Sequence, residues 1–333
     1  MEKNCMTLDF NTVLSAVRGT AKTQLENGKL WLYRFTDAQS EAYRAYSSDF
    51  FKKTKATAGI RLEFLTNSAA LCLEGECFVA SSRNFYSFDV YVNGSLVCHK
   101  LEYTEKGYAK YQLKVDLGDA EEKHVRIYFP WSAQANIVAL SIDDGSSFVP
   151  TQRPYKMICF GDSITHGYDA HNPSFSYASR LADMLCADHI NKGIGGERFF
   201  PTLANLKDDF EPDYITVAYG TNDWSGAEKE DFDKNATNFY RNLSKNYPNT
   251  TIFALAPVWR INCETRITSV GEFTYVAKKT KEIANTLPNV VLIDCIDFIP
   301  HEKAYFSPDV LHPNDTGFAC YAAALFAEIK KHI

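Results

Sequence analysis

Short stretches in which apolar and polar residues alternate run through the first 150 positions of the chain. In residues 60–65, Ile60, Leu62 and Phe64 fall on one face and Arg61 and Glu63 on the other. Such a period of two predicts a half-buried strand. Strands are predicted at 30–35, 60–65, 70–79, 87–92, 95–99, 111–115, 125–129 and 137–142, and a helix only at 11–17. Many short strands at regular spacing indicate an all-β sandwich or jelly roll.

The pattern changes after a linker rich in Gly, Ser and Pro at 145–154. Apolar runs now alternate with segments of helical period. Strands are predicted at 155–160, 190–192, 214–219, 251–256 and 290–294, and helices at 176–187, 231–246, 270–286 and 314–331. Strand–helix alternation predicts a parallel sheet covered on both faces, an α/β fold. Two domains are therefore predicted: a β-sandwich, jelly-roll-like accessory domain at 1–150 and an α/β domain at 151–333.

Composition and charge exclude several classes of function. The chain has 333 residues and a net charge of −6, from 35 basic and 41 acidic side chains. The absence of a basic run argues against a nucleic-acid partner. No apolar stretch is long enough to span a membrane. The beginning of the sequence lacks the apolar core of a secretory signal. With nine scattered cysteines, this predicts a reducing, cytoplasmic location, although a trimmed leader stays an alternative.

Chemically useful residues follow the predicted strands of the second domain. In open α/β sheets, ligands bind beyond the carboxyl ends of the strands. The candidate loops share this position at one edge of the sheet. They are Gly161-Asp162-Ser163, Gly193-Ile194-Gly195-Gly196, Gly220-Thr221-Asn222-Asp223, Pro257-Val258-Trp259-Arg260 and Asp309-Val310-Leu311-His312.

Three of these residues have the chemistry of nucleophilic acyl transfer. The hydroxyl of Ser163 needs a base to take its proton, and His312 can supply one. Asp309, three residues before His312, can reach the imidazole and fix its tautomer. Each feature also has an ordinary structural explanation. Ser163 can cap a helix after a strand, and Asp309 with His312 can form a turn at a helix entry.

Three hydrogen-bond donors are candidates for the oxyanion of a tetrahedral intermediate. They are the backbone N–H groups of Ser163 and Gly196 and the side-chain amide of Asn222. The glycines could instead serve only a tight turn, and Asn222 an Asx-turn.

Four of these five loops resemble the four sequence blocks of the SGNH hydrolases of the GDSL type, in the order of that family. The blocks are Gly161-Asp162-Ser163-Ile164, Asn191-Lys192-Gly193-Ile194-Gly195-Gly196, Gly220-Thr221-Asn222-Asp223 and Asp309-Val310-Leu311-His312-Pro313. The resemblance covers 156–333 and implies a flavodoxin-like doubly wound parallel sheet. It also implies Ser163, His312 and Asp309 as a catalytic triad, and Ser163, Gly196 and Asn222 as the oxyanion hole. Gly195 is the alternative if the alignment shifts by one residue.

The layout of a β domain before such a hydrolase resembles the family-two carbohydrate esterases. Those enzymes often lack the acidic triad member, whereas this chain has Asp309. Asp162, Trp224, Trp259 and Arg260 are the candidate substrate-binding residues, because an aromatic face beside the site suits a sugar ring. Packing of both tryptophans, or a pair between Arg260 and Asp223, is the alternative.

These features together predict a serine esterase for short-chain acyl esters, above all acetyl esters on carbohydrate. No cofactor or metal is required, and the expected partner is a small-molecule or oligosaccharide ester. A lysophospholipase or thioesterase, and a carbohydrate-binding protein with a degenerate hydrolase domain, are the alternatives. The sequence does not define the oligomeric state.

Overall fold

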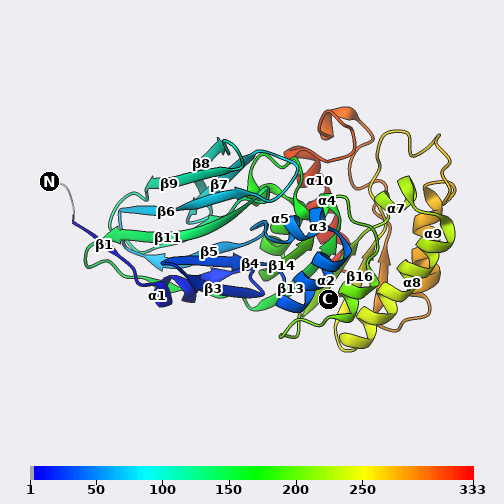
Figure 1. The fold of residues 1–333 in the computed structure, drawn as a ribbon, viewed down its shortest axis with the longest axis horizontal. Helices are drawn as coiled ribbons and strands as arrows, with labels where there is room; N and C mark the ends of the chain where they lie inside the picture. Colours follow the sequence, from blue (N-terminus) through cyan, green and yellow to red (C-terminus); the bar gives the residue numbers. More distant parts are fainter. Residues whose placement is uncertain (1–3) are drawn as a thin grey trace. The chain divides into compact units, whose positions relative to one another are not determined.

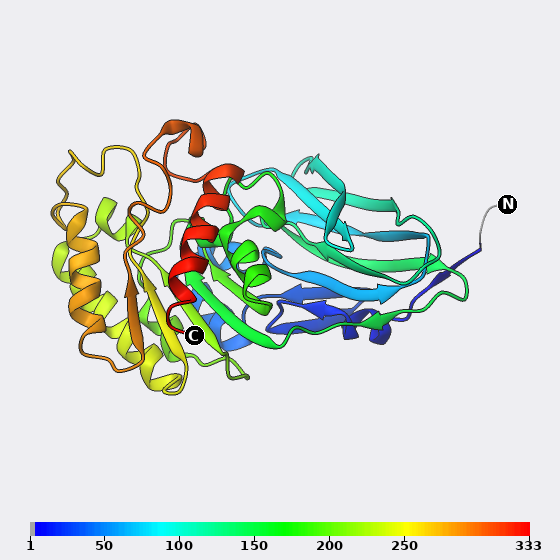
Figure 2. The same ribbon diagram turned by 180° about the vertical axis from the view of Figure 1, so that it is seen from behind.

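The computed structural model describes residues 4–333, and Figures 1 and 2 show it as a ribbon from two opposite sides. The contacts within the chain divide it into two compact units. The first holds the residues up to Phe35, with Lys52–Arg153 and Asn172–Ser174, and the second holds Thr36–Phe51, Pro154–His171 and Phe175–Ile333. The predicted domains 1–150 and 151–333 are continuous in sequence, whereas these units are interleaved.

Two antiparallel sheets build the first unit. One has the order β3-β4-β11-β6-β9, with β1 paired to β11, and the other has the order β12-β5-β10-β7-β8, with β2 paired to β5. The strands are β1 (Cys5–Thr7), β2 (Val17–Arg18), β3 (Lys22–Glu26), β4 (Lys29–Tyr33), β5 (Arg61–Thr66), β6 (Ala70–Val79), β7 (Phe85–Val92), β8 (Ser95–Tyr103), β9 (Tyr108–Asp116), β10 (Lys123–Tyr128), β11 (Ala133–Asp143) and β12 (Val149–Pro150).

One apolar core joins the two sheets. Leu73 on β6 and Phe88 on β7 are both fully buried and belong to the same cluster of core residues. Asn93-Gly94 forms the turn of a hairpin between β7 and β8, with Val92 paired to Ser95 and Asn93 at φ 49°. The prediction of a β sandwich is confirmed, and the strands that the alternation missed are short or lie at sheet edges.

Three helices occur before the first long strand, where the sequence pattern predicted only one. They are α1 (Phe10–Ser15), α2 (Asp37–Tyr46) and α3 (Ser48–Thr54). The prediction of a single helix is therefore wrong. The start of α2 is fixed by a capping box, in which Thr36 bonds the N–H of Gln39 and the side chain of Gln39 bonds the N–H of Thr36. Such reciprocal bonds satisfy N–H groups that a helix start otherwise leaves unpaired.

A five-stranded parallel sheet forms the centre of the second unit. Its order is β14-β13-β15-β16-β17, the flavodoxin-like order of a doubly wound sheet. The strands are β13 (Tyr155–Gly161), β14 (Ala187–Gly193), β15 (Tyr214–Ala218), β16 (Thr251–Leu255) and β17 (Val290–Ile293). The predicted fold class of this part is confirmed. β13 lies between β14 and β15, so the loop that carries Ser163 leaves the sheet where the strand order reverses.

Helices cover this sheet on both faces. α10 packs on α5, and α8 packs on α6 and α9; α10 is the red helix in front of the strands in Figure 2. The α-helices are α4 (Ser163–His166), α5 (Tyr177–Met184), α6 (Pro201–Asn205), α7 (Thr221–Gly226), α8 (Lys229–Asn246), α9 (Thr274–Ala284) and α10 (Asp315–Ile329), with 3-10 turns at Pro173–Phe175 and Lys303–Tyr305. Helix α5 ends earlier than predicted because Cys186 adopts φ 50°, and β14 begins at the next residue.

Helix α2 belongs to the second unit through a buried polar cluster. The Nζ of Lys192 donates to Gln39 Oε1 at 2.7 Å and to Asp208 Oδ1 at 2.6 Å. The Nε2 of Gln39 in turn donates to the carbonyl of Leu206 at 2.9 Å. All three polar side chains of this Gln39–Lys192–Asp208 cluster are buried. A buried lysine needs such partners, which explains why residues 36–51 group with the α/β unit.

Among residues 4–333, no helix combines the length and apolar character needed to cross a bilayer. All nine cysteines are free thiols.

Candidate active site

The nucleophile candidate lies on a sharp turn between β13 and α4. Asp162 follows the strand and caps the helix, since its Oδ1 accepts the N–H of Ile164 at 2.9 Å. Ser163 is the first residue of α4 and is buried, as is the rest of that helix. The backbone N–H of Ser163 therefore lies at a helix start, where N–H groups are open to a negative charge.

His312 and Asp309 lie on the loop before α10 and meet Ser163 across 149 positions of sequence. The Nε2 of His312 is 2.8 Å from Ser163 Oγ, and its Nδ1 is 2.5 Å from Asp309 Oδ2. The other oxygen of Asp309 accepts the N–H groups of Leu311 and His312 at 2.9 and 3.0 Å. The candidate nucleophile, base and orienting acid are thus joined in one hydrogen-bonded chain.

The electrostatics of Asp309 suit the role of an ionised partner. Partial burial raises its pKa, but the hydrogen bonds from the side chain and backbone of His312 and from Leu311 outweigh it and lower the pKa below the usual range. Asp309 is therefore an anion at neutral pH, and it can hold Nδ1 of His312 in the protonated form.

The glycine loop after β14 carries the second candidate for an oxyanion donor. Gly196 adopts φ 86°, which is the left-handed region that favours glycine. The N–H of Gly195, the alternative residue, donates to His166 Nδ1 at 3.3 Å. That of Gly196 takes part in none of the hydrogen bonds found among residues 4–333. The geometry thus favours Gly196 over Gly195.

The third donor, Asn222, is oriented by a backbone carbonyl. Its Nδ2 donates one hydrogen to the carbonyl of Glu197 at 2.9 Å, and an amide nitrogen carries two hydrogens. The loop is set by Gly220 at φ 117°, where a Cβ would approach Val276 Cγ1 to 2.5 Å. The carbonyl that holds Asn222 follows Gly196 directly, so the two donor loops are fixed to each other.

A group of buried carboxyls lies behind these donors. Burial raises the pKa of Asp162 to about 6, against the opposing N–H of Ile164 and the charges of His312 and Arg260. Burial also raises the pKa of Asp223 to about 7 and that of Glu197 well above its usual range. Glu197 Oε2 accepts the hydroxyl of Tyr219 at 2.8 Å. Sequence reasoning did not assign Glu197 a role.

The structure corrects one of the predicted substrate contacts and gives another a structural role. Trp224 is fully buried, and its indole N–H donates to the carbonyl of Gly271 at 3.0 Å. It has no face open to a sugar ring, because it packs in the core under Arg260 and Arg266. Asp162 is 2% exposed, and its carboxylate caps α4 through the N–H of Ile164.

Trp259 and Arg260 are partly exposed and lie at the end of β16. The Trp259 ring stacks on His301 at 5.2 Å, and its N–H donates to Glu264 at 3.0 Å. The Nη1 of Arg260 donates to Ser225 Oγ at 2.7 Å and to Thr221 Oγ1 at 3.1 Å. Arg260 therefore braces the Asn222 helix α7, and the suggested pair with Asp223 is not its partner here. Burial and the charge of Arg266 lower the pKa of Arg260.

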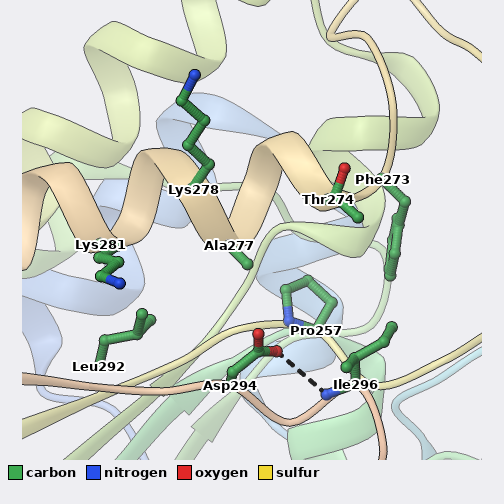
Figure 3. A pocket seen from close by; sticks show the side chains of 9 residues that line it. All are labelled: Pro257, Phe273, Thr274, Ala277, Lys278, Lys281, Leu292, Asp294 and Ile296. Carbon is green, nitrogen blue, oxygen red and sulfur yellow. Dashed lines mark hydrogen bonds between the residues drawn. The ribbon is translucent and has the colours of Figure 1, made fainter.

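Two cavities lie near the ends of β16 and β17. A small one of about 20 Å³ includes Asp162, Ile164 and Thr221 in its wall. A larger one of about 350 Å³ is lined by Pro257, Phe273, Leu292 and Ile296, with Lys278 and Lys281 at its edge. Figure 3 shows that Lys278 extends away from Pro257, and that Asp294 is bonded to the N–H of Ile296. The larger cavity contains none of the triad residues.

Two further side chains contact His312, and the sequence gave no signal for either. The Tyr168 ring is stacked on the imidazole at 5.6 Å, with an interplanar angle of 28°. Asp169 Oδ2 is 3.6 Å from Nδ1 of His312. The ligand atoms of Asp169, Asp309 and His312 lie within 4.8 Å of one another, close enough for a metal ion. His312 is, however, already engaged with Ser163.

Comparison with known proteins agrees with this geometry. Residues 159–320 match the model of the GDSL-like lipase/acylhydrolase family. No curated protein sequence matches the chain. The resemblance carried by the four sequence blocks is thereby confirmed.

Several solved structures share the fold of the whole chain. The salicylyl-acyltransferase SsfX3 from a tetracycline biosynthetic pathway is 20% identical, with a TM-score of 0.85 over 99% of this chain and 97% of that one. A family-two carbohydrate esterase from Cellvibrio japonicus is 16% identical, with a TM-score of 0.67 over 99% and 98%. An acetyl xylan esterase, Est2A, from the rumen bacterium Butyrivibrio proteoclasticus is 14% identical, with a TM-score of 0.65 over 99% and 98%.

Proposed function

We propose, from the premise that residues 159–320 form a carboxylic ester hydrolase domain of the GDSL-like lipase/acylhydrolase family, that this protein is a serine esterase for short-chain acyl esters. The acyl group is acetyl and the alcohol is a carbohydrate hydroxyl. The observation that carries the proposal is the hydrogen-bonded chain from Ser163 through His312 to Asp309, at 2.8 and 2.5 Å.

Acylation begins when Nε2 of His312 takes the proton of Ser163 and the Oγ attacks the ester carbonyl. Asp309 accepts a hydrogen bond from the N–H at Nδ1 and stabilises the imidazolium that forms. The alcohol leaves with the proton from His312, and an acyl-enzyme remains. Water then repeats the same steps and releases the acid.

Charge develops on the carbonyl oxygen during both steps. The N–H groups of Ser163 and Gly196 and the second amide hydrogen of Asn222 are the donors for this oxyanion. Donors that are held in place before the reaction need no reorganisation, which is the main benefit of such a site.

Support for a carbohydrate acetyl ester comes from the fold and from one exposed aromatic residue. The structural neighbours named above include a family-two carbohydrate esterase and an acetyl xylan esterase. Trp259, in the loop after β16, is a partly exposed residue, and aromatic rings suit the apolar face of a sugar. Arg260, next to it, is the polar contact candidate.

The first test compares hydrolysis of p-nitrophenyl acetate, butyrate and octanoate. The wild type should prefer acetate, and Ser163→Ala should abolish the hydrolysis. Ser269→Ala, at an exposed serine of the loop before α9, should leave it unchanged. Acetylated xylan and acetylated cello-oligosaccharides come next, with release of acetate as the measurement.

Other outcomes lead to the alternatives. A Ser163-dependent preference for octanoate would support a lysophospholipase or thioesterase instead. Binding of oligosaccharides without turnover of any ester would support a carbohydrate-binding protein.

Acyl transfer to an alcohol is a second candidate activity, since a neighbour with a TM-score of 0.85 is named an acyltransferase. The same acyl-enzyme serves both reactions, and the resolving nucleophile decides between them. Hydrolysis of p-nitrophenyl acetate with added cellobiose or salicyl alcohol distinguishes them. Formation of an acetylated acceptor at the expense of acetate would favour transfer.

A further inference from the structure

The loop after α4 is built against the base His312. Gly167 ends α4 with φ 103°, and the N–H groups of Gly167 and Tyr168 both donate to the carbonyl of Ser163, at 3.1 and 3.0 Å. Tyr168 is buried and stacks its ring on the imidazole of His312. The nucleophile residue thus positions, through its own carbonyl, the loop that contacts its base.

The next residue in this loop, Asp169, directs its carboxylate at the far nitrogen of the same imidazole. Its Oδ2 is 3.6 Å from His312 Nδ1. Asp169 adopts φ 66°, a left-handed conformation that is costly for a residue other than glycine and best tolerated by Asn and Asp. The chain therefore uses an unfavourable backbone conformation at the point where a second acid reaches the base.

The two carboxylates at Nδ1 differ in geometry and exposure. Asp309 is at 2.5 Å and 40% exposed, whereas Asp169 is at 3.6 Å and 16% exposed. Nδ1 carries one hydrogen. Because the distance to Asp309 is the shorter one, Nδ1 donates this hydrogen bond to Asp309. Asp169 lies beyond hydrogen-bond distance and acts through its charge, which water screens less at a less exposed position.

We propose that Asp169 is a second positioning acid for His312. Asp169 stabilises the imidazolium during acylation and deacylation. When Asp309 is removed, Asp169 accepts the hydrogen bond from the N–H at Nδ1. This inference rests on the proposed serine-esterase function. It also explains how the base keeps its orientation although its main acid is accessible to solvent.

The charged groups near His312 come from four segments. Asp309 belongs to the loop of His312 itself, and Asp169 and the buried Asp162 belong to the loops on either side of α4. Arg260, at the end of β16, influences Asp162 and Asp309 electrostatically. Replacing Asp169 by Asn removes one of these negative charges. Asparagine has nearly the same size as aspartate, and it also tolerates the left-handed conformation.

The activity test is a pH–rate profile of p-nitrophenyl acetate hydrolysis for the wild type and Asp169→Asn. Loss of an anion beside the imidazole makes protonation harder, so the midpoint of the acid limb should move down by about one pH unit. Asp209→Asn, at an exposed acid before β15, changes the net charge equally and should leave the midpoint in place. A residue with only a structural role would lower the rate at every pH without moving the midpoint.

A double-mutant cycle tests the reserve role. Adding Asp169→Asn to Asp309→Ala should reduce kcat by about tenfold more than Asp169→Asn reduces it in the wild type, because the two acids share one task. Equal reductions in both backgrounds would overturn this part of the proposal.

An NMR titration of the His312 imidazole, assigned with His312→Gln, gives a result without turnover. A lower titration midpoint in Asp169→Asn supports the proposal, and an unchanged midpoint overturns it. Ser163→Ala separates the two proposals. Full esterase activity in Ser163→Ala would refute the proposed function, while the titration would still decide the role of Asp169.

Discussion

The amide of Asn222 has its two hydrogens assigned to different tasks. One bonds the carbonyl of Glu197 at 2.9 Å, and in the proposed mechanism the other binds the oxyanion. Asn222→Ala should lower kcat by about 10²–10³-fold, the usual cost of one oxyanion donor, with little change in KM. Steady-state kinetics with p-nitrophenyl acetate measure both constants.

The matched control for this variant is Asn242→Ala on α8. Asn242 also donates its amide to a backbone carbonyl, that of Pro201, at 3.2 Å, but it has no place in the triad or oxyanion hole. Its activity should stay within a few-fold of wild type. A loss of the same size in both variants would show that Asn222 acts through stability and not through the oxyanion.

Single residues also mark the limit of prediction from sequence. The residues that could be selected each lie within a recognisable sequence block: Ser163, Asn222, Asp309 and His312. Asp169 could not be selected, because its approach to His312 depends on one left-handed backbone angle, φ 66°. Trp224 was wrongly predicted to contact substrate, since its place after a predicted strand does not reveal that its side chain turns into the core.

At the scale of elements, the start of α10 supports the loop that carries His312. Asn314 caps this helix through Oδ1, which accepts the N–H groups of Thr316 and Gly317 at 3.1 and 3.0 Å. Its Nδ2 donates to the carbonyl of Ala304 at 2.7 Å. Asn314→Ala should lower the free energy of unfolding by about 1–2 kcal/mol, measured by urea denaturation.

Asn314→Ser is the control for this prediction. Serine keeps a capping oxygen for the helix but not the bond to Ala304, so it should recover a substantial part of the lost stability. If alanine and serine were equally destabilising, the cap would contribute little, and the bond to the 3-10 segment would be the important one.

Elements with a long and regular period were the most predictable. The pattern predicted a helix at 231–246, and α8 spans Lys229–Asn246; the strand predicted at 70–79 is β6. Helix α2 was missed although its capping box, Thr36-Asp37-Ala38-Gln39, is a sequence signal for a helix start. The two-residue strands β2 and β12 carry too few residues for any period to appear.

At the scale of the whole molecule, the buried Gln39–Lys192–Asp208 cluster joins residues 36–51 to the rest of the second unit. The cluster is therefore important for stability. Lys192→Met would leave the carboxylate of Asp208 buried without its cation. Loss of one partner of a buried ion pair costs about 3–5 kcal/mol. A thermal unfolding scan and urea denaturation should both show this loss, while the pH–rate profile keeps its shape.

The double variant Lys192→Met with Asp208→Leu is the informative comparison. It removes both charges, so it should be more stable than Lys192→Met alone. If the double variant were the less stable of the two, the charge left by Lys192→Met would not be the cause of its instability.

The same cluster has a consequence for synthesis on the ribosome. Gln39 is 153 residues ahead of Lys192 in the chain. At about 5–20 residues per second, helix α2 leaves the ribosome about 8–30 s before the lysine that it binds. Gln39 and Tyr43 are both buried in the finished protein. During that interval, the part of the second unit that buries them has not yet been synthesised. Nascent chains arrested before Lys192 should therefore expose α2 to chaperones and proteases, and translation past that point should withdraw it.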